Sequence, residues 1–180
     1  MKEQFVILVN EKDEAHGEME KIEAHKKGLL HRAFSVFIFN SKGEMLLQRR
    51  ALNKYHSGGL WSNTCCSHPF PGEATDAGAV RRLREEMGFG AGLAKAFDFI
   101  YRAAFDNGLT EYEFDHVYTG EYNGSIHANP DEVCDYCYKN MDDIRHSLQT
   151  HPEKFTPWLH IVFPKIEGWW KQHYKNVVSL

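Results

Sequence analysis

The sequence contains no long apolar run and no excess of basic residues. Its first hydrophobic stretch, FVILV, is far shorter than the roughly 20 apolar residues of a membrane-spanning helix and too short for a signal peptide. No later segment is apolar enough to span a membrane either, so we expect a cytoplasmic protein. The net charge of −4 argues against general binding to nucleic acids or anionic membranes, but leaves room for a local basic pocket that binds a small anion.

Repeats, low-complexity tracts and a disulfide framework are also missing. The four cysteines are Cys65, Cys66, Cys134 and Cys137, and in a cytoplasmic chain of this size such residues are more often free, catalytic or metal-bound than paired. Hydrophobic residues make up 42% of the chain and charged residues 26%, which is ordinary for a globular protein. We expect one domain over residues 1–180, since this length is enough to bury a core.

Local patterns predict strands that alternate with loops and helices. The turn sequences SKG (41–43) and DNG (106–108) each join two of these strands as a hairpin. Residues 51–72 are rich in Gly, Asn, Ser and Pro and predict a long loop, which in a compact domain is usually functional. The predicted strands are 5–10, 33–40, 44–50, 97–105, 110–122 and 132–139.

A helix is predicted from an N-cap at Thr75 to about Met87, with Gly88 as its stop. Val80, Leu83 and Met87 then share the face that points to the core. Two later helices are predicted, one over 141–150 capped by Asn140, and one opened by Thr156-Pro157 that Pro164 should kink or split. The order of elements indicates an α/β (α+β) fold, a mixed sheet with helices packed on its faces.

Histidine is abundant, with eleven residues, and three of them come with carboxylates in a pattern that could bind a metal. His25 and His31 lie just before a predicted strand, and His68 lies in the long loop. Glu111 and Glu113 are two apart on a strand, so both side chains point to one face. Such a set suits Zn, Mn, Fe or Mg, although a solvated strand face is the commoner reason for such a pair of acids.

The cysteines allow several interpretations. CC (65–66) and CDYC (134–137) could form a four-thiolate zinc site, but the first pair lacks the spacer of zinc knuckles. The odd separation of Cys134 and Cys137 puts them on opposite faces of a strand, where buried, inert thiols are expected. Neighbouring Cys65 and Cys66 also point apart. Cys66, in a Cys-x-His unit, is the better candidate for an active thiol.

The helix over 75–87 resembles the Nudix box, G-x5-E-x7-R-E-U-x-E-E-x-G-U. Two positions depart from that pattern, Ser67 in place of its first Gly and Arg82 in place of the Glu that follows Arg81. In Nudix hydrolases the acidic row binds metals that activate water on a diphosphate. An arginine in this row argues for diphosphate binding without hydrolysis. The matching residues are Glu73, Arg81, Leu83, Glu85, Glu86, Gly88 and Phe89.

Across almost its whole length the chain resembles the type I isopentenyl-diphosphate delta-isomerases, enzymes of Nudix fold. The resemblance depends on many motifs in the family's order, each weak alone and highly specific together. These motifs are EKIEAH, HRAFSVFIFN, QRRALNK, WSNTCCSHP, RRLREEMG, YRA, EYEFDHV, NPDEV and TPWL. The resemblance implies a Nudix-like sheet sandwiched between helices, with additional N- and C-terminal elements.

The resemblance also implies roles for individual residues. Cys66 and Glu113 match the two proton-transfer groups, and Tyr101 matches the residue that hydrogen-bonds the glutamate. Glu86 matches the residue that helps to hold Mg²⁺ on the substrate diphosphate. The other matches are a divalent metal site (Mn²⁺, Zn²⁺ or Mg²⁺) of His25, His31, His68, Glu111 and Glu113, diphosphate-binding cations Lys21, Arg50, Lys54 and Arg82, and Trp158 over the hydrocarbon.

The implied reaction interconverts isopentenyl and dimethylallyl diphosphate in isoprenoid biosynthesis. A proton adds at one carbon and another leaves, through a tertiary carbocation, so two proton-transfer groups are needed on opposite faces of a small alkene. The alternatives are a Nudix hydrolase of a nucleoside diphosphate derivative, which Glu85 and Glu86 favour, and an inactive regulatory protein.

We expect the partner to be a small-molecule diphosphate, with no nucleic acid or membrane, and the protein to be a monomer. Cys65 is expected to be structural, and Trp169 and Trp170 to pack on the core.

Overall fold

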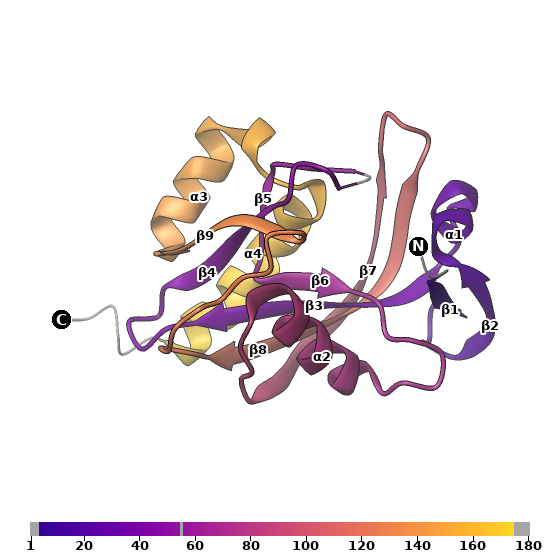
Figure 1. Ribbon diagram of the computed structural model, residues 1–180, viewed down its shortest axis with the longest axis horizontal. Coiled ribbons are helices and arrows are strands. Elements are labelled where there is room, and N and C mark those ends of the chain that lie inside the picture. The colour runs from indigo at the N-terminus through magenta and orange to yellow at the C-terminus, as the bar shows by residue number, and fades with distance from the viewer. Residues whose placement is uncertain (1–3, 55, 175–180) are drawn as a thin grey trace.

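The computed structural model describes residues 4–54 and 56–174 and contains one branched sheet with helices on both faces (Figure 1). Each predicted strand and helix is present. In chain order the elements are β1 (Phe5–Val9), β2 (Ala15–Glu20), α1 (Lys21–Lys27), β3 (His31–Phe39), β4 (Met45–Arg50), β5 (Trp61–Ser62), β6 (Cys65–Ser67), α2 (Thr75–Met87), β7 (Leu93–Ala104), β8 (Thr110–Glu121), β9 (Val133–Lys139), α3 (Met141–Thr150), a 3-10 turn (Pro152–Lys154) and α4 (Pro157–His173).

Strand β3 is the centre of the sheet. It runs parallel to β8 from the pair His31–Glu113 to the pair Phe39–Glu121, and β7 extends this side as the antiparallel neighbour of β8. Its other edge pairs with β6, and β1 meets it at His31. Strand β4 pairs with β5 and β9. Because β3 and β8 are parallel and in register, the start of β3 lies beside the Glu-x-Glu segment of β8.

The predicted hairpin between β3 and β4 is present, but the two strands separate beyond their first pair, Phe39–Met45. Residues 61–67 fill the wedge between them. Thr64 Oγ1 accepts from the Ile38 backbone N–H and donates to the Leu46 carbonyl, so it bridges both strands. The prediction of one long loop over 51–72 is therefore wrong, since the wedge offers unpaired strand edges to β5 and β6.

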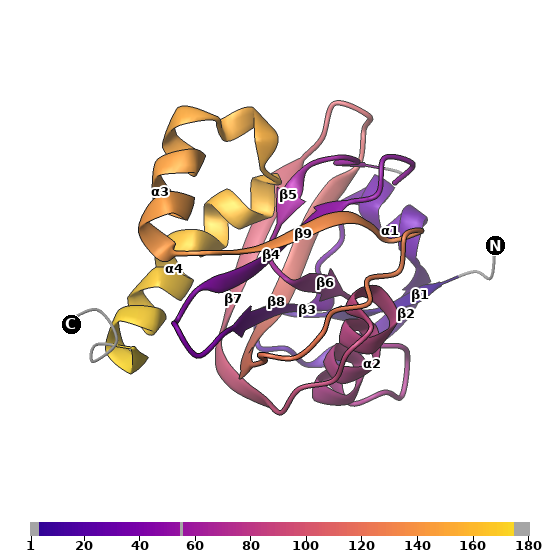
Figure 2. The ribbon, with the colours of Figure 1, turned by 60° about the vertical axis from the view of Figure 1, so that its left-hand side comes forward.

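The pleat of β3 divides the core in two. Phe34, Val36 and Ile38 pack with Leu83 and Met87 under α2, and alternate residues of the same strand point to the opposite face, beneath α3 and α4. Figures 1 and 2 show α2 apart from α3 and α4, with α1 and β2 at the far end of the sheet. The predicted mixed sheet between helices is confirmed. The second cluster contains Phe37, Phe39, Val117, Ile144, Leu159, Val162 and Ile166.

Helix α2 differs from the prediction at its start. Its N-cap is Ala74, with no side-chain hydrogen bond, and Thr75 is already helical. Val80 is only half-buried, so its predicted place in the core is wrong, because the buried stripe runs through Ala79 instead. Gly88 ends the helix in the left-handed region at φ 73°, as predicted.

The two C-terminal helices begin as predicted. Asn140 Oδ1 accepts from the Asp143 backbone N–H at the start of α3, and Thr156 precedes Pro157 at the first position of α4. Helix α4 runs through Pro164 without a break, so of the two predicted effects, a kink or a split, the split does not occur. Trp169 and Trp170 pack against the core cluster, as expected. Among the described residues, no helix is both long and apolar enough to span a membrane.

The sequence interpretation missed β2 and α1. Helix α1 is short, with the Glu20 carboxylate accepting from the backbone N–H groups of Ile22 and Glu23, and with Gly28 in the left-handed region at its end. It holds Lys21 and His25 one turn apart on one face. Both residues were predicted to belong to the functional site, and α1 is the element that carries them there.

Candidate active site

A small cavity lies between the wedge, the C-terminal half of α2 and the start of β8, and it joins an outer groove. The inner cavity has a volume of about 60 Å³ and the groove about 380 Å³. The cavity and the groove share six lining residues, so the two form one path from the surface: Lys21, Lys54, Ser67, His68, Arg82 and Glu132. The other residues that line the inner cavity are Gln48, Arg50, His56, Cys66, Glu86, Tyr101, Glu111, Glu113 and Trp158.

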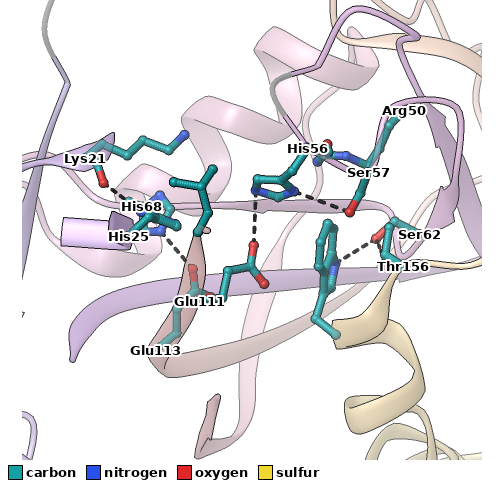
Figure 3. Close-up of polar contacts among 12 residues, drawn as sticks. Lys21, His25, Arg50, His56, Ser57, Ser62, His68, Glu111, Glu113 and Thr156 are labelled. Atoms are coloured by element: carbon teal, nitrogen blue, oxygen red, sulfur yellow. Dashed lines mark hydrogen bonds and ion pairs between the residues drawn. The ribbon is translucent and has the colours of Figure 1, made fainter. Parts of the chain in front are cut away.

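At one side of the cavity His25, His31, His68 and Glu113 bring their ligand atoms together. These atoms all lie within 4.8 Å of one another. His68 Nε2 is 2.9 Å from Glu113 Oε1 and 3.1 Å from His31 Nε2, and Figure 3 shows His68 facing Glu113. Glu111, the fifth predicted ligand, is not part of this group.

Backbone carbonyls fix the orientation of two of the imidazoles. His25 Nδ1 donates to the Lys21 carbonyl at 2.7 Å, and His31 Nδ1 donates to the Leu29 carbonyl at 2.8 Å. A carbonyl can only accept, so each ring carries its proton on Nδ1 and turns the lone pair of Nε2 to the cluster. This is the usual arrangement of a histidine metal ligand. The donor set therefore fits a divalent cation, and these four residues could hold one.

Tyr101 joins the two glutamates of β8. Its hydroxyl lies 3.0 Å from Glu111 Oε2 and 2.7 Å from Glu113 Oε2. Burial and both carboxylates hold the pKa of Tyr101 well above its usual range, so the phenol keeps its proton. Burial and the charge of Glu113 raise the pKa of Glu111. Despite its burial, Glu113 has a lowered pKa, because the neighbouring imidazoles of His31 and His68 favour its anion.

The thiol of Cys66 lies at another side of the cavity, among uncharged partners. Its Sγ donates to Asn63 Oδ1 at 3.0 Å and lies 3.4 Å from Ser35 Oγ. Burial raises the pKa of the Cys66 thiol, and Asp115 raises it further. Cys65 is fully buried in the cluster under α2, since neighbours on a strand point to opposite faces.

All four cysteines are free. Cys134 is exposed and Cys137 half-buried, so the expectation that both are buried is wrong, because β9 is exposed at three consecutive positions, 134–136, and is therefore open to solvent on both faces. No cysteine belongs to the group of converging ligands found in the described part of the chain, which disfavours a four-thiolate zinc site.

The predicted cations lie around the cavity mouth. Lys21, Arg50, Lys54 and Arg82 all line the inner cavity. Burial, together with Arg82 and Arg50, lowers the pKa of Lys21 to about 8. Glu132 pairs with Lys54 and lies 3.2 Å from Arg82, so a carboxylate already contacts two of the cations.

Arg82 changes what the Nudix-like helix can do. Its guanidinium pairs with Glu85 at 2.7 Å and with Glu86 at 2.6 Å. The second Glu86 oxygen accepts from Gln48 Nε2 at 2.9 Å. Glu86 lines the cavity, but Glu85 does not, since it is on the exposed side of α2. The acidic row is thus divided by a cation and does not form one carboxylate cluster.

An aromatic wall closes the remaining side of the cavity. Trp158 is almost fully buried, and the guanidinium of Arg50 lies 5.1 Å from its ring centroid. His56 stacks on Phe105 with a centroid distance of 4.6 Å and meets Trp158 edge-on at 5.7 Å. Figure 3 shows His56 pointing at Glu111, with Nε2 3.5 Å from Oε1. Burial and the charge of Arg50 lower the pKa of His56 to about 3, so this ring is neutral.

Every residue predicted for the site lies in the inner cavity or in the adjoining histidine cluster. The sequence interpretation missed Gln48, His56, Asn63 and Glu132 as site residues. Gln48 could have been found, since it is two residues before Arg50 on a strand and shares its face. His56 gives no such signal, because it lies in an irregular segment that only the folded chain brings to Glu111.

Comparison with known proteins supports the family resemblance found in the sequence motifs. Residues 29–159 match the NUDIX domain family. The isopentenyl-diphosphate Delta-isomerase of Pectobacterium atrosepticum is 52% identical over 166 residues, which cover 92% of this chain and 93% of that protein. The isopentenyl-diphosphate Delta-isomerase 2 of Aromatoleum aromaticum is 50% identical over 157 residues, which cover 87% of this chain and 83% of that protein.

Solved structures agree on the fold. DR0079 from Deinococcus radiodurans superposes with a TM-score of 0.76 at 18% identity, over 90% of this chain and 98% of that chain. The MutT protein from Methanosarcina mazei gives a TM-score of 0.64 at 19% identity, over 77% of this chain and 94% of that chain. At these identities the likeness concerns the fold alone. Taken with the close relatives above, it shows that the chain belongs to the isopentenyl-diphosphate Delta-isomerase family and has the Nudix fold.

Proposed function

We propose that the protein interconverts isopentenyl and dimethylallyl diphosphate, with Cys66 and Glu113 as the two proton-transfer groups and Tyr101 as the hydrogen-bond partner of Glu113. The observation that carries the proposal is that Cys66 and Glu113 line one cavity, while the groups around each of them differ. Cys66 is kept as a neutral thiol, and Glu113 as an anion. One group can therefore give a proton while the other takes one, as moving a double bond requires.

The substrate is a small alkene on a diphosphate, and the cavity offers matching surroundings for both parts. Lys21, Arg50, Lys54 and Arg82 would bind the diphosphate at the mouth, and their remote binding energy would position the hydrocarbon. The inner cavity is small, at about 60 Å³, which limits the group that can enter it to a short one. The ring of Trp158 would stabilise the developing cation, by roughly 0.5–2 kcal/mol in comparable cases.

Two divalent metals belong to the proposal. His25, His31, His68 and Glu113 would hold the first, and Glu111 would join them if its side chain adopted another rotamer. When bound, that ion would polarise Glu113 and favour proton transfer at its carboxylate. Imidazole suits Zn²⁺, and carboxylate oxygens suit Mn²⁺ and Mg²⁺, so the mixed donor set leaves these three ions as candidates. Glu86 would hold Mg²⁺ on the substrate diphosphate, since its carboxylate lines the cavity beside Arg82.

The hydrolase alternative is less well supported. A Nudix hydrolase needs its acidic row free to hold metals, and here Arg82 pairs with both Glu85 and Glu86.

The cytoplasmic location, the monomeric state and the absence of nucleic-acid partners stay predictions from the sequence.

The proposal is tested by proton NMR of isopentenyl diphosphate with the protein and Mg²⁺ in D2O. We expect the methyl signals of the dimethylallyl isomer, deuterium in the exchanged positions and no free phosphate. Glu85→Gln is a matched variant, because Glu85 lies outside the cavity: an isomerase should keep its activity, and a Nudix hydrolase should lose it. Phosphate release without isomerisation would refute the proposal.

A further inference from the structure

A buried hydrogen-bond chain connects the aromatic wall to the thiol. Trp158 Nε1 donates to Ser62 Oγ at 2.8 Å, and Ser62 Oγ donates to Asn63 Oδ1 at 3.0 Å. The same Asn63 oxygen accepts from Cys66 Sγ at 3.0 Å. Ser62, Asn63 and Trp158 are each at most 3% exposed. Trp158 and Cys66, at the two ends of this hydrogen-bond chain, are therefore linked through two buried polar side chains, Ser62 and Asn63.

The direction of each bond in this chain is fixed by chemistry. An indole N–H can only donate, so Ser62 accepts from Trp158 and keeps its own proton for Asn63. The Asn63 amide nitrogen donates to the carbonyls of Val36 at 3.1 Å and Cys65 at 3.0 Å. Its oxygen must then be the atom turned to Ser62 and Cys66. No member of the chain can turn without losing a buried hydrogen bond.

The backbone holds the same parts together. Ser62 pairs with Gln48 of β4, and the Thr156 N–H donates to the Trp61 carbonyl at 2.9 Å, which ties the start of α4 to β5. Thr156 Oγ1 also donates to Ser62 Oγ, at 3.1 Å (Figure 3). The Ser62 oxygen thus accepts twice and donates once, and its hydroxyl has one orientation.

We infer that Ser62 and Asn63 are positioning residues that align the Trp158 ring with the Cys66 thiol. The inference rests on the proposed function. In that reaction the proton adds to one alkene carbon and the charge develops on its neighbour, so thiol and ring must meet adjacent atoms of one small substrate. Such groups need to be held within about 0.5 Å of the productive geometry, and a shift of about 1 Å can cost about 100-fold in rate.

The test compares Ser62→Ala with Ser62→Thr and Thr156→Val. Ser62→Ala removes the hydroxyl that links Trp158 to Asn63, so we expect kcat to fall by about 10–100-fold. KM should change by less than about threefold, because the proposed diphosphate-binding cations take no part in this hydrogen-bond chain. Ser62→Thr keeps the hydroxyl and should restore most of the activity. Thr156→Val is the matched control, since it removes a bond to the same oxygen and leaves the link to Cys66 intact.

Two further measurements separate positioning from a structural role. The indole N–H resonance of Trp158, identified by its loss in Trp158→Phe, should move in Ser62→Ala and return in Ser62→Thr. Ser62→Ala and Trp158→Phe break one link, so their combined effect on kcat should be smaller than the product of the single effects.

The inference is overturned if Ser62→Ala keeps full kcat, if the Trp158 resonance does not move, or if Thr156→Val loses as much kcat as Ser62→Ala. A wild-type protein without isomerase activity would instead refute the proposed function, and this inference with it, before any variant is compared.

Discussion

The carboxylate side and the thiol side of the cavity are built in opposite ways. Around Glu113 the partners are ionisable groups: the imidazole of His68 and the phenol of Tyr101 within hydrogen-bonding distance, and the imidazole of His31 at 3.5 Å. Around Cys66 the nearest partners are an amide and a hydroxyl. Ionisable neighbours stabilise an anion and can bind a cation, whereas neutral ones leave a buried thiol in its protonated form. The difference indicates which group accepts and which group holds a proton in the free protein.

Glu113→Gln should have the largest effect, because the carboxylate belongs both to the proton-transfer pair and to the metal cluster. We expect isomerase activity to become undetectable. Loss of a residue that only hydrogen-bonds a metal ligand lowers metal affinity by about 10–100-fold, and loss of Glu113, a proposed ligand itself, should lower it further. Turnover and metal content after dialysis measure the two effects. Asp98→Asn, on neighbouring β7, is a control that should change neither. Full metal retention by Glu113→Gln would contradict the assignment.

Cys66→Ala should affect the thiol side of the cavity and leave the carboxylate side unchanged. We expect a fall in kcat of about 10²–10⁴-fold, the usual contribution of a positioned acid or base. Metal content should be unchanged, because the thiol is not part of the histidine cluster. Cys65→Ala is the matched control: it changes a neighbouring thiol that packs under α2, and should lower the thermal midpoint without reducing kcat. Equal losses in both variants would argue against a chemical role for Cys66.

This comparison also shows what the sequence could and could not predict. The two acids of the carboxylate side follow from local spacing, since Glu111 and Glu113 are two apart on one strand and point to one face, whereas helix α1, which carries Lys21 and His25, was not predicted. The surroundings of the thiol depend on a non-local event, the separation of β3 from β4. Residues 61–67 look like a loop because their partners lie on strand edges distant in the sequence, such as Arg49 for Trp61 and Leu46 for Thr64. The hydrogen bonds of Ser62 and Asn63 could not be predicted for the same reason.

Tyr101→Phe should act more weakly, and only on the carboxylate side. The substitution removes the hydroxyl shared by Glu111 and Glu113 and leaves every proposed metal ligand in place. We expect kcat to fall by about 10–100-fold, as for other partners that orient a metal-binding group. Tyr118→Phe on β8 is the control, because its ring packs in the cluster under α2. A Tyr101→Phe variant with wild-type kcat would show that Glu113 needs no support from the phenol.

The smallest effect concerns the cations that the two sides share. Lys21 has its pKa lowered to about 8 by burial and by Arg82 and Arg50, so it is charged below that pH and loses its charge as the pH rises through it. Diphosphate binding should weaken in the same range. We expect kcat/KM to decline above about pH 8, by no more than about tenfold per unit, since one proton is involved. Arginine stays charged throughout, so Lys21→Arg should remove this limb of the profile. An unchanged limb in Lys21→Arg would assign it to another group, because the substitution leaves Glu113 and Cys66, and hence the contrast between the two sides, intact.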